Sequence, residues 1–129
     1  MNIVIVGAGE VGTSLARHLV REGHDVTVID SSEARTTKLR ESVDVMSYTG
    51  SGASMVGDAK RGGADAYVTS DLKYHDADRA GGMPLVHVPH AAVERAALKR
   101  WARTLGRLLG EEGVETRFAE ADTDPWQVA

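Results

Sequence analysis

The stretch Ile3–Gly12, which reads IVIVGAGEVG, decides the fold of this chain. Its first four residues are β-branched, as in a strand buried on both faces of a parallel sheet. The next six match the pattern G-x-G-x-x-G. From Glu10 to Glu22 apolar residues recur at helical spacing, and Gly23 can end that helix. The stretch therefore predicts a strand, a Gly-rich turn and a helix in direct succession.

A second strand and a second helix follow this unit. Residues 26–29 predict the strand, which ends at Asp30, and Ser31 or Ser32 can cap a helix running to about Glu41. A Gly-rich turn between a strand and a helix, followed by a strand that ends in an acid, is the context in which this motif binds a dinucleotide. In that setting Gly7 permits the tight turn, Gly9 lets the backbone approach the pyrophosphate, and Gly12 allows close helix packing.

The predicted ligand is an adenine nucleotide. Free N–H groups at the start of the helix attract phosphate, and Asp30 can accept hydrogen bonds from the ribose hydroxyls while repelling a 2′-phosphate. This favours NAD over NADP, with ADP or ATP as related ligands. The predicted contact residues are Gly7, Gly9, Glu10, Val11, Gly12, Asp30, Ser31 and Arg35. The alternative is that the glycines serve only a tight turn and Asp30 only caps a helix.

The rest of the chain continues the alternation of strands and helices. Further strands are predicted at 43–48, 66–69, 85–88 and 114–118, and further helices at 53–61, 75–80 and 91–109. The fold class is α/β: one three-layer, Rossmann-like, doubly wound domain over residues 1–129, with a mostly parallel sheet of about six strands. The expected strand order is 3-2-1-4-5, with the last short strand at an edge. In the longest helix, a stripe that includes Trp101 and Leu108 is expected to be buried, and Trp126 is expected to cover a sheet edge.

Composition excludes several classes of protein. The formal net charge of −4 argues against a nucleic-acid surface. The absence of cysteine excludes disulfides and thiolate metal sites and fits a cytoplasmic protein. No apolar run approaches the roughly 20 residues of a membrane span, and the amino terminus has no basic leader.

Residues 1 to about 48 resemble the Trk potassium-uptake regulator family, in its amino-terminal (RCK) nucleotide-binding domain. The resemblance rests on Val6–Gly12, on Gly23–Asp30, and on Glu33-Ala34-Arg35 with Lys38-Leu39. It implies a regulatory module that binds NAD(H) or adenine nucleotides. The chain departs from that family after its third strand, where Gly50–Ser54 replaces a Gly-Asp-Gly-Thr-like turn and lacks its acid.

From about Tyr48 to the end, the chain is similar to the carboxy-terminal segment of the Nif-three-like family, which includes GTP cyclohydrolase I type 2 homologues. The matching residues are Gly50–Gly52, Gly63–Thr69, Asp71–Ala77, His90 with Glu94, and Thr123–Trp126. This resemblance implies a two-lobed, ring-forming protein with a metal pair, to which an amino-terminal lobe adds adjacent histidines that this sequence lacks. Residues 1–48 and 49–129 are therefore interpreted as two halves of a hybrid, either engineered or produced by unusual natural recombination.

His90 and Glu94 are the candidate metal ligands. They are four residues apart on a predicted helix, so their side chains share a face, and the Nif-three-like resemblance implies that both are ligands. A catalytic site normally draws at least three ligands from the protein, so metal binding is expected to be weak or absent. A polar cluster around His75 after the fourth strand can be either an acid–base site or a capped loop.

Three functions compete on this sequence. The first is a nucleotide-binding module without catalytic activity. The second is a metal-dependent hydrolase of the Nif-three-like type. The third is a product of fold recombination that binds no ligand. An adenine nucleotide is the expected partner, nucleic acid and membrane are not expected, and the sequence leaves a homo-oligomer open.

Overall fold

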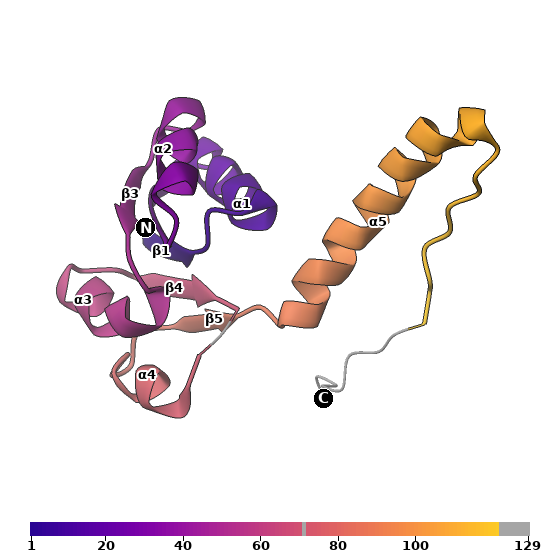
Figure 1. The fold of residues 1–129 in the computed structure, drawn as a ribbon. Coiled ribbons are helices and arrows are strands. Elements are labelled where there is room, and N and C mark those ends of the chain that lie inside the picture. The colour runs from indigo at the N-terminus through magenta and orange to yellow at the C-terminus, as the bar shows by residue number, and fades with distance from the viewer. Residues whose placement is uncertain (71, 122–129) are drawn as a thin grey trace. The chain divides into compact units, whose positions relative to one another are not determined.

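The computed structural model describes residues 1–70 and 72–121 of the chain (Figure 1). The chain divides into two compact units, Met1–Val88 and Pro89–Ala129. Thr123–Trp126, including the tryptophan predicted to cover a sheet edge, lies outside the described residues.

The first unit is built on a parallel sheet. Its strands are β1 (Asn2–Val6), β2 (Asp25–Asp30), β3 (Met46–Thr49), β4 (Ala66–Thr69) and β5 (Leu85–His87). Their order is β3-β2-β1-β4-β5, and every pair is parallel. The predicted order is confirmed, and within the described residues the sheet has five strands rather than about six.

Helices cover both faces of this sheet. Alternation along β1 sends Ile3 and Ile5 into a core with α1 (Glu10–Arg21) and α2 (Glu33–Ser42), whereas Val4 enters a second core on the opposite face. The second core includes residues of the 3₁₀ helix η1 (Gly52–Met55) and of α3 (Val56–Arg61), together with Ala80 and Met83 beyond α4 (Tyr74–Asp78). Figure 1 shows α1 and α2 together beside β1 and β3, with α3 and α4 near β4 and β5. The fold is therefore α/β and Rossmann-like.

The third strand begins later than predicted. Val43 has an extended backbone but directly follows α2, and its carbonyl accepts the N–H of Val45 in a local turn. The pairing with β2 starts only at Met46, opposite Thr27. The side chain of Val43 is nevertheless buried in the core beneath α1 and α2, so its apolar character reflects packing rather than strand pairing.

The second unit consists of α5 (His90–Leu109), a short 3₁₀ helix η2 (Gly110–Glu112) and the segment after it. The strand predicted at 114–118 does not form. Gly113 has the left-handed φ of +75°, and the Thr116 hydroxyl donates to the carbonyl of Ala102 on α5. Arg95 donates to two carbonyls further along the segment, at 2.6 and 2.7 Å. The polar groups of this segment therefore bond to a helix instead of to a strand.

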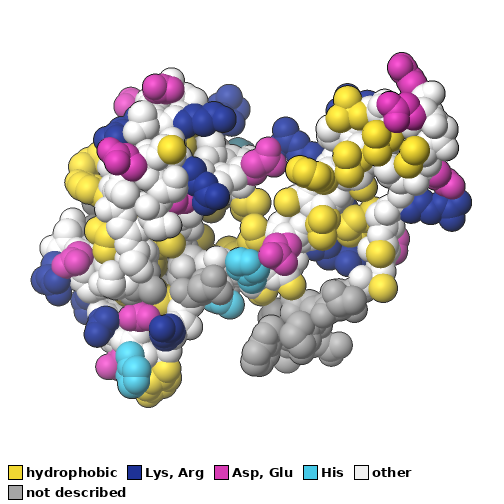
Figure 2. Space-filling model, in the orientation of Figure 1, with side chains coloured by type: hydrophobic (Ala, Val, Ile, Leu, Met, Phe, Trp, Pro, Cys, Tyr) yellow, Lys and Arg dark blue, Asp and Glu magenta, His cyan; other side chains and the backbone are white. Residues whose placement is uncertain are grey.

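The apolar stripe of α5 is not the buried surface that its spacing predicts. Trp101 is 63% exposed and Leu108 is 67% exposed. Figure 2 shows hydrophobic side chains gathered on the visible face of this helix. Within its unit, the segment after η2 contacts Arg95, Lys99 and Ala102 of α5, which the helical spacing places on a different face from Trp101 and Leu108. The expectation that Trp101 is a core residue is therefore wrong.

Among the described residues, no helix combines the length and the apolar character that crossing a membrane requires.

Candidate nucleotide site at the Gly-rich turn

Two glycines of the turn are required by the protein's own geometry. Gly7 has φ +103°, a conformation that glycine adopts without steric cost, and its N–H donates to the carbonyl of Ile29 at 2.7 Å. A Cβ at Gly12 would lie 1.8 Å from the Gly7 carbonyl oxygen. The close approach of α1 to the end of β1 therefore excludes any side chain at Gly12.

Gly9 is different, because neither its backbone conformation nor its contacts with the described residues require a glycine. It is the N-cap of α1 with φ −73° and ψ −172°, which most residues can adopt, and a Cβ there would meet no atom of the described chain within 4 Å. The first turn of a helix leaves backbone N–H groups without intrahelical acceptors, and a glycine offers no side chain to cap them. Glu10 and Val11, which begin α1, are both exposed. The space beside Gly9 is thus open at the positive end of the α1 dipole.

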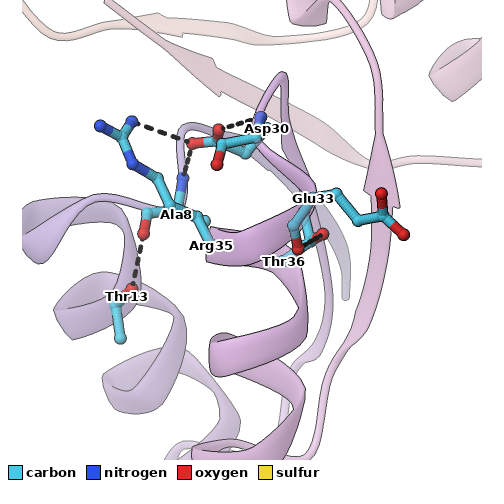
Figure 3. A network of polar contacts seen from close by, with 7 residues as sticks. Ala8, Thr13, Asp30, Glu33, Arg35 and Thr36 are labelled. Carbon is cyan, nitrogen blue, oxygen red and sulfur yellow. Dashed lines mark hydrogen bonds and ion pairs between the residues drawn. The ribbon is translucent and has the colours of Figure 1, made fainter.

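Asp30 lies at the carboxyl end of β2, where its side chain joins two turns (Figure 3). Its Oδ2 accepts the N–H of Ala8 at 2.7 Å, and its Oδ1 accepts the N–H of Ser32 at 2.7 Å. The residue is only 6% exposed. Because each carboxylate oxygen has two lone pairs, both oxygens retain acceptor capacity after these bonds. The carboxylate thus holds the N-cap residue Ser32 instead of capping the first N–H groups of α2, and these two bonds do not use up its acceptor capacity.

Arg35 and Ser31 extend the same edge of the site. The Arg35 guanidinium lies 3.7 Å from Oδ2 of Asp30, and Figure 3 shows it on the side of Asp30 that also faces Ala8. Its side chain is 63% exposed, so it is accessible to a ligand as well as to Asp30. Ser31 is exposed, and Ser32 is the N-cap of α2.

A third loop reaches the same place, and the sequence reasoning did not assign it to the site. The N–H of Gly50, directly after β3, donates to the backbone carbonyl of Asp30 at 2.9 Å. A Cβ at Gly52 would lie 2.2 Å from Cγ1 of Val6, the residue before the Gly-rich turn. The loops that follow β1, β2 and β3 therefore meet around Asp30. The signal in the sequence was the second Gly-x-Gly, at Gly50 and Gly52, after a predicted strand.

The candidate metal ligands lie in the second unit. Nε2 of His90 is 3.1 Å from Oε1 of Glu94, and both side chains are more than 60% exposed. The predicted shared helix face is confirmed. No group of three or more His, Asp or Glu side chains suited to a metal occurs within residues 1–70 and 72–121. Asp71, the first residue of the Asp71–Ala77 stretch that carries the Nif-three-like resemblance, lies outside the described residues.

The fold is similar to that of several solved proteins, two of which match most of this chain. The BdcA structure from E. coli matches 87% of this chain and 76% of its own chain, with a TM-score of 0.56 and 20% identity. L-tryptophan dehydrogenase from Nostoc punctiforme matches 88% of this chain and 32% of its own, with a TM-score of 0.56 and 15% identity. At these identities the similarity shows a Rossmann-like fold alone.

Two groups of curated relatives match in sequence. The Trk system potassium uptake protein TrkA of Halomonas elongata is 43% identical over 53 residues, which cover 41% of this chain and 12% of that protein. The GTP cyclohydrolase 1 type 2 homolog of Halobacterium salinarum is 34% identical over 119 residues, which cover 90% of this chain and 43% of that protein. The chain thus spans less than half the length of either relative.

One family model matches almost the whole chain. It is the model for Duf34/NIF3 (NGG1p interacting factor 3), and it matches residues 9–125. The match begins inside the Gly-rich turn and continues through residue 48, where the two resemblances were expected to meet. The Nif-three-like resemblance is therefore wider than the second half of the chain. With a match of this extent, the chain belongs to the Duf34/NIF3 family.

Proposed function

We propose that this chain binds NAD(H), or a related adenine nucleotide such as ADP or ATP, at the turn Gly7–Gly12, and that it does so as a binding module without catalytic activity. The pyrophosphate would lie at the start of α1 and the adenosine ribose near Asp30 and Ser31. Glu10, Val11 and Arg35 would border the ligand.

The observation that carries this proposal is the contrast between Gly9 and Gly12. The backbone of the protein itself excludes a side chain at Gly12, whereas nothing in the described residues excludes one at Gly9. A glycine at a helix N-cap with open space beside it suits the close approach of an external group to the backbone. Backbone N–H groups and the helix dipole favour an anionic group there, which is the chemistry of a phosphate.

The position of Asp30 supports NAD over NADP. Its buried carboxylate is held in place by the N–H groups of Ala8 and Ser32. It retains lone pairs that could accept hydrogen bonds from the ribose hydroxyls. A second negative charge on a 2′-phosphate would be repelled by this carboxylate.

Calorimetric titration with NAD, NADH, ADP, ATP and NADP tests the proposal. We expect binding of NAD or an adenine nucleotide, weaker binding of NADP, and loss of binding in Gly9→Val. Gly110→Val is the matched control, because Gly110 also has open space in the described structure and φ −61° but lies in the other unit. Absence of heat with all five ligands at millimolar concentration would leave the turn as a remnant without function.

A metal-dependent hydrolase is the second candidate, favoured by family membership together with the His90–Glu94 pair. Two ligands give weak affinity unless further ligands come from another chain or from outside the described residues. A homo-oligomer could supply them, and equilibrium sedimentation with and without zinc measures that directly.

The proposed hybrid origin is still untested. One family model covers the chain on both sides of residue 48, so the sequence match does not mark a junction there. The shared sheet provides its physical test. Strand β3 pairs with β2 over four residues, so recombination within β3 would have had to preserve that register. We expect the sheet of the first unit to melt in one transition by calorimetry. Separate melting of β3 from β1 and β2 would contradict this.

A further inference from the structure

Tyr67 connects the middle of the sheet to the loop that follows β3. It lies in β4, its side chain is fully buried, and its hydroxyl donates to the carbonyl of Gly52. It belongs to the same core as Val4, Ile29 and Val56. A buried carbonyl without a partner is costly, so this hydroxyl and the Gly52 carbonyl satisfy each other.

The loop that Tyr67 holds lies against two parts of the candidate site. Gly52 packs on Val6, immediately before the Gly-rich turn, and this contact leaves no room for a Cβ. Gly50 donates its N–H to the carbonyl of Asp30 at 2.9 Å. The exposed residue between them, Ser51, is the N-cap of η1, and its hydroxyl makes no cap hydrogen bond among the described residues.

The strand order indicates which part of the ligand loop 50–52 would adjoin. The phosphate turn follows β1, the ribose acid Asp30 follows β2, and the loop 50–52 follows β3, in the spatial order β1, β2, β3. Ligands of open α/β sheets bind outside the carboxyl ends of the strands. A dinucleotide with its pyrophosphate at α1 and a ribose at Asp30 would therefore extend its nucleoside towards loop 50–52.

We propose that Tyr67 is a positioning residue for the nucleotide site, which fixes loop 50–52 beside the nucleoside half of the ligand through the bond from its hydroxyl to Gly52. Tyr67 is buried and touches no ligand itself, so it acts only through the loop. This inference rests on the proposed nucleotide-binding function and adds a residue to it from outside the Gly-rich turn. Burial and the nearby carboxylate of Asp76 raise the pKa of Tyr67 to about 12, so its hydroxyl stays protonated and able to donate to Gly52 even above pH 10.

The test is Tyr67→Phe in the full chain, titrated with AMP, ADP and NAD at a temperature where circular dichroism shows the variant folded. We expect affinity to fall by a common factor of about 5 to 10 for all three ligands, as for the loss of one hydrogen bond that orders a binding loop. Gly9→Ala should instead weaken NAD and ADP more than AMP, because the pyrophosphate lies at that residue. Tyr74→Phe is the matched control, since Tyr74 is 82% exposed on α4, and its affinities should equal those of the wild type.

The outcomes separate the two proposals. If the wild type binds none of the three ligands, the proposed function fails and this inference fails with it. If the wild type binds and folded Tyr67→Phe binds equally well, nucleotide binding stands and the positioning role is overturned. If the variant does not fold, hydrogen exchange on the wild type decides: saturating NAD should increase protection at residues 50–55, and unchanged protection there overturns the inference.

Discussion

The carboxylate of Asp30 accepts the backbone N–H of Ala8 at 2.7 Å, and so ties the end of β2 to the Gly-rich turn after β1. The two residues are 22 positions apart in the chain, and both are buried. The residue expected to recognise a ribose therefore also holds together the turn expected to recognise the phosphates. Substitutions of Asp30 will change stability as well as any ligand affinity, and the two effects need separate measurements.

Replacing Asp30 with Ala should destabilise the protein by about 2 to 4 kcal/mol, because the buried N–H of Ala8 and the partly buried N–H of Ser32 would both lose a charged acceptor. Urea denaturation measures this. Asp30→Asn keeps one acceptor oxygen and should cost less than Asp30→Ala. Arg35→Ala is the control for the ion pair: with its side chain 63% exposed, it should change the free energy of unfolding by less than about 1 kcal/mol. An equal cost for Arg35→Ala and Asp30→Ala would contradict this account of the turn.

Substitutions at Gly12 and Gly9 should have very different effects on stability. Gly12→Ala forces a Cβ against the carbonyl of Gly7, a backbone group that cannot rotate away, and should destabilise by about 3 kcal/mol or more. Gly9→Ala enters open space at an ordinary φ and should change stability by less than about 1 kcal/mol. Thermal unfolding of the two variants side by side gives the comparison. A Gly9→Ala variant as unstable as Gly12→Ala would remove the main support for an external ligand at Gly9.

The first half of the chain was predictable because its signals are local. The run 3–6, the turn 7–12 and the acid at Asp30 each specify a backbone conformation within a few residues, and the strand order follows from short right-handed crossovers. Val43 and Val45 show the limit of such reasoning. Their apolar character is real, but it serves packing beneath α1 and α2 before β3 starts.

The remaining features depend on contacts between distant residues. Nothing near Tyr67 in the sequence indicates that its hydroxyl reaches Gly52, 15 residues earlier. The segment 114–118 alternates in a way that suits a strand, yet its Thr116 hydroxyl donates to the carbonyl of Ala102 on α5. Just beyond it, the carbonyls of Glu120 and Ala121 accept from Arg95 of the same helix. The stripe through Trp101 predicts an apolar surface, and spacing alone does not say what packs against that surface.

Raising the pH above 10 should lower the stability of the wild type, because Tyr67 then ionises more readily in the unfolded chain than in the folded protein. The pKa of its phenol in the folded protein is raised from 10.0 to about 12, with burial as the larger cause and Asp76 as the smaller. The protonated phenol is thus favoured by folding: its contribution to stability is fully present below pH 10 and is lost as the pH rises towards 12. We expect the difference in unfolding free energy between wild type and Tyr67→Phe to fall by about 2 to 3 kcal/mol over that interval. A difference that stays constant from pH 9 to 12 would show that the phenol is not buried as described.

The His90–Glu94 pair should bind zinc weakly, and His90→Ala should show it. The two side chains lie on one exposed face at the start of α5, 3.1 Å apart, and within the described residues no third metal ligand completes a site with them. Two protein ligands leave most of the coordination shell to water, which gives low affinity and fast loss of the ion.

We therefore expect substoichiometric metal by elemental analysis after purification without added salts, and no hydrolysis of GTP or phosphate esters above background. Zinc in excess should therefore raise the Tm of the wild type only slightly more than that of His90→Ala. One equivalent of zinc, iron or manganese per chain, lost in His90→Ala and retained in the exposed control His18→Ala, would instead show a metal site built with ligands from a further chain or from outside the described residues. That result would place the hydrolase ahead of the nucleotide-binding module.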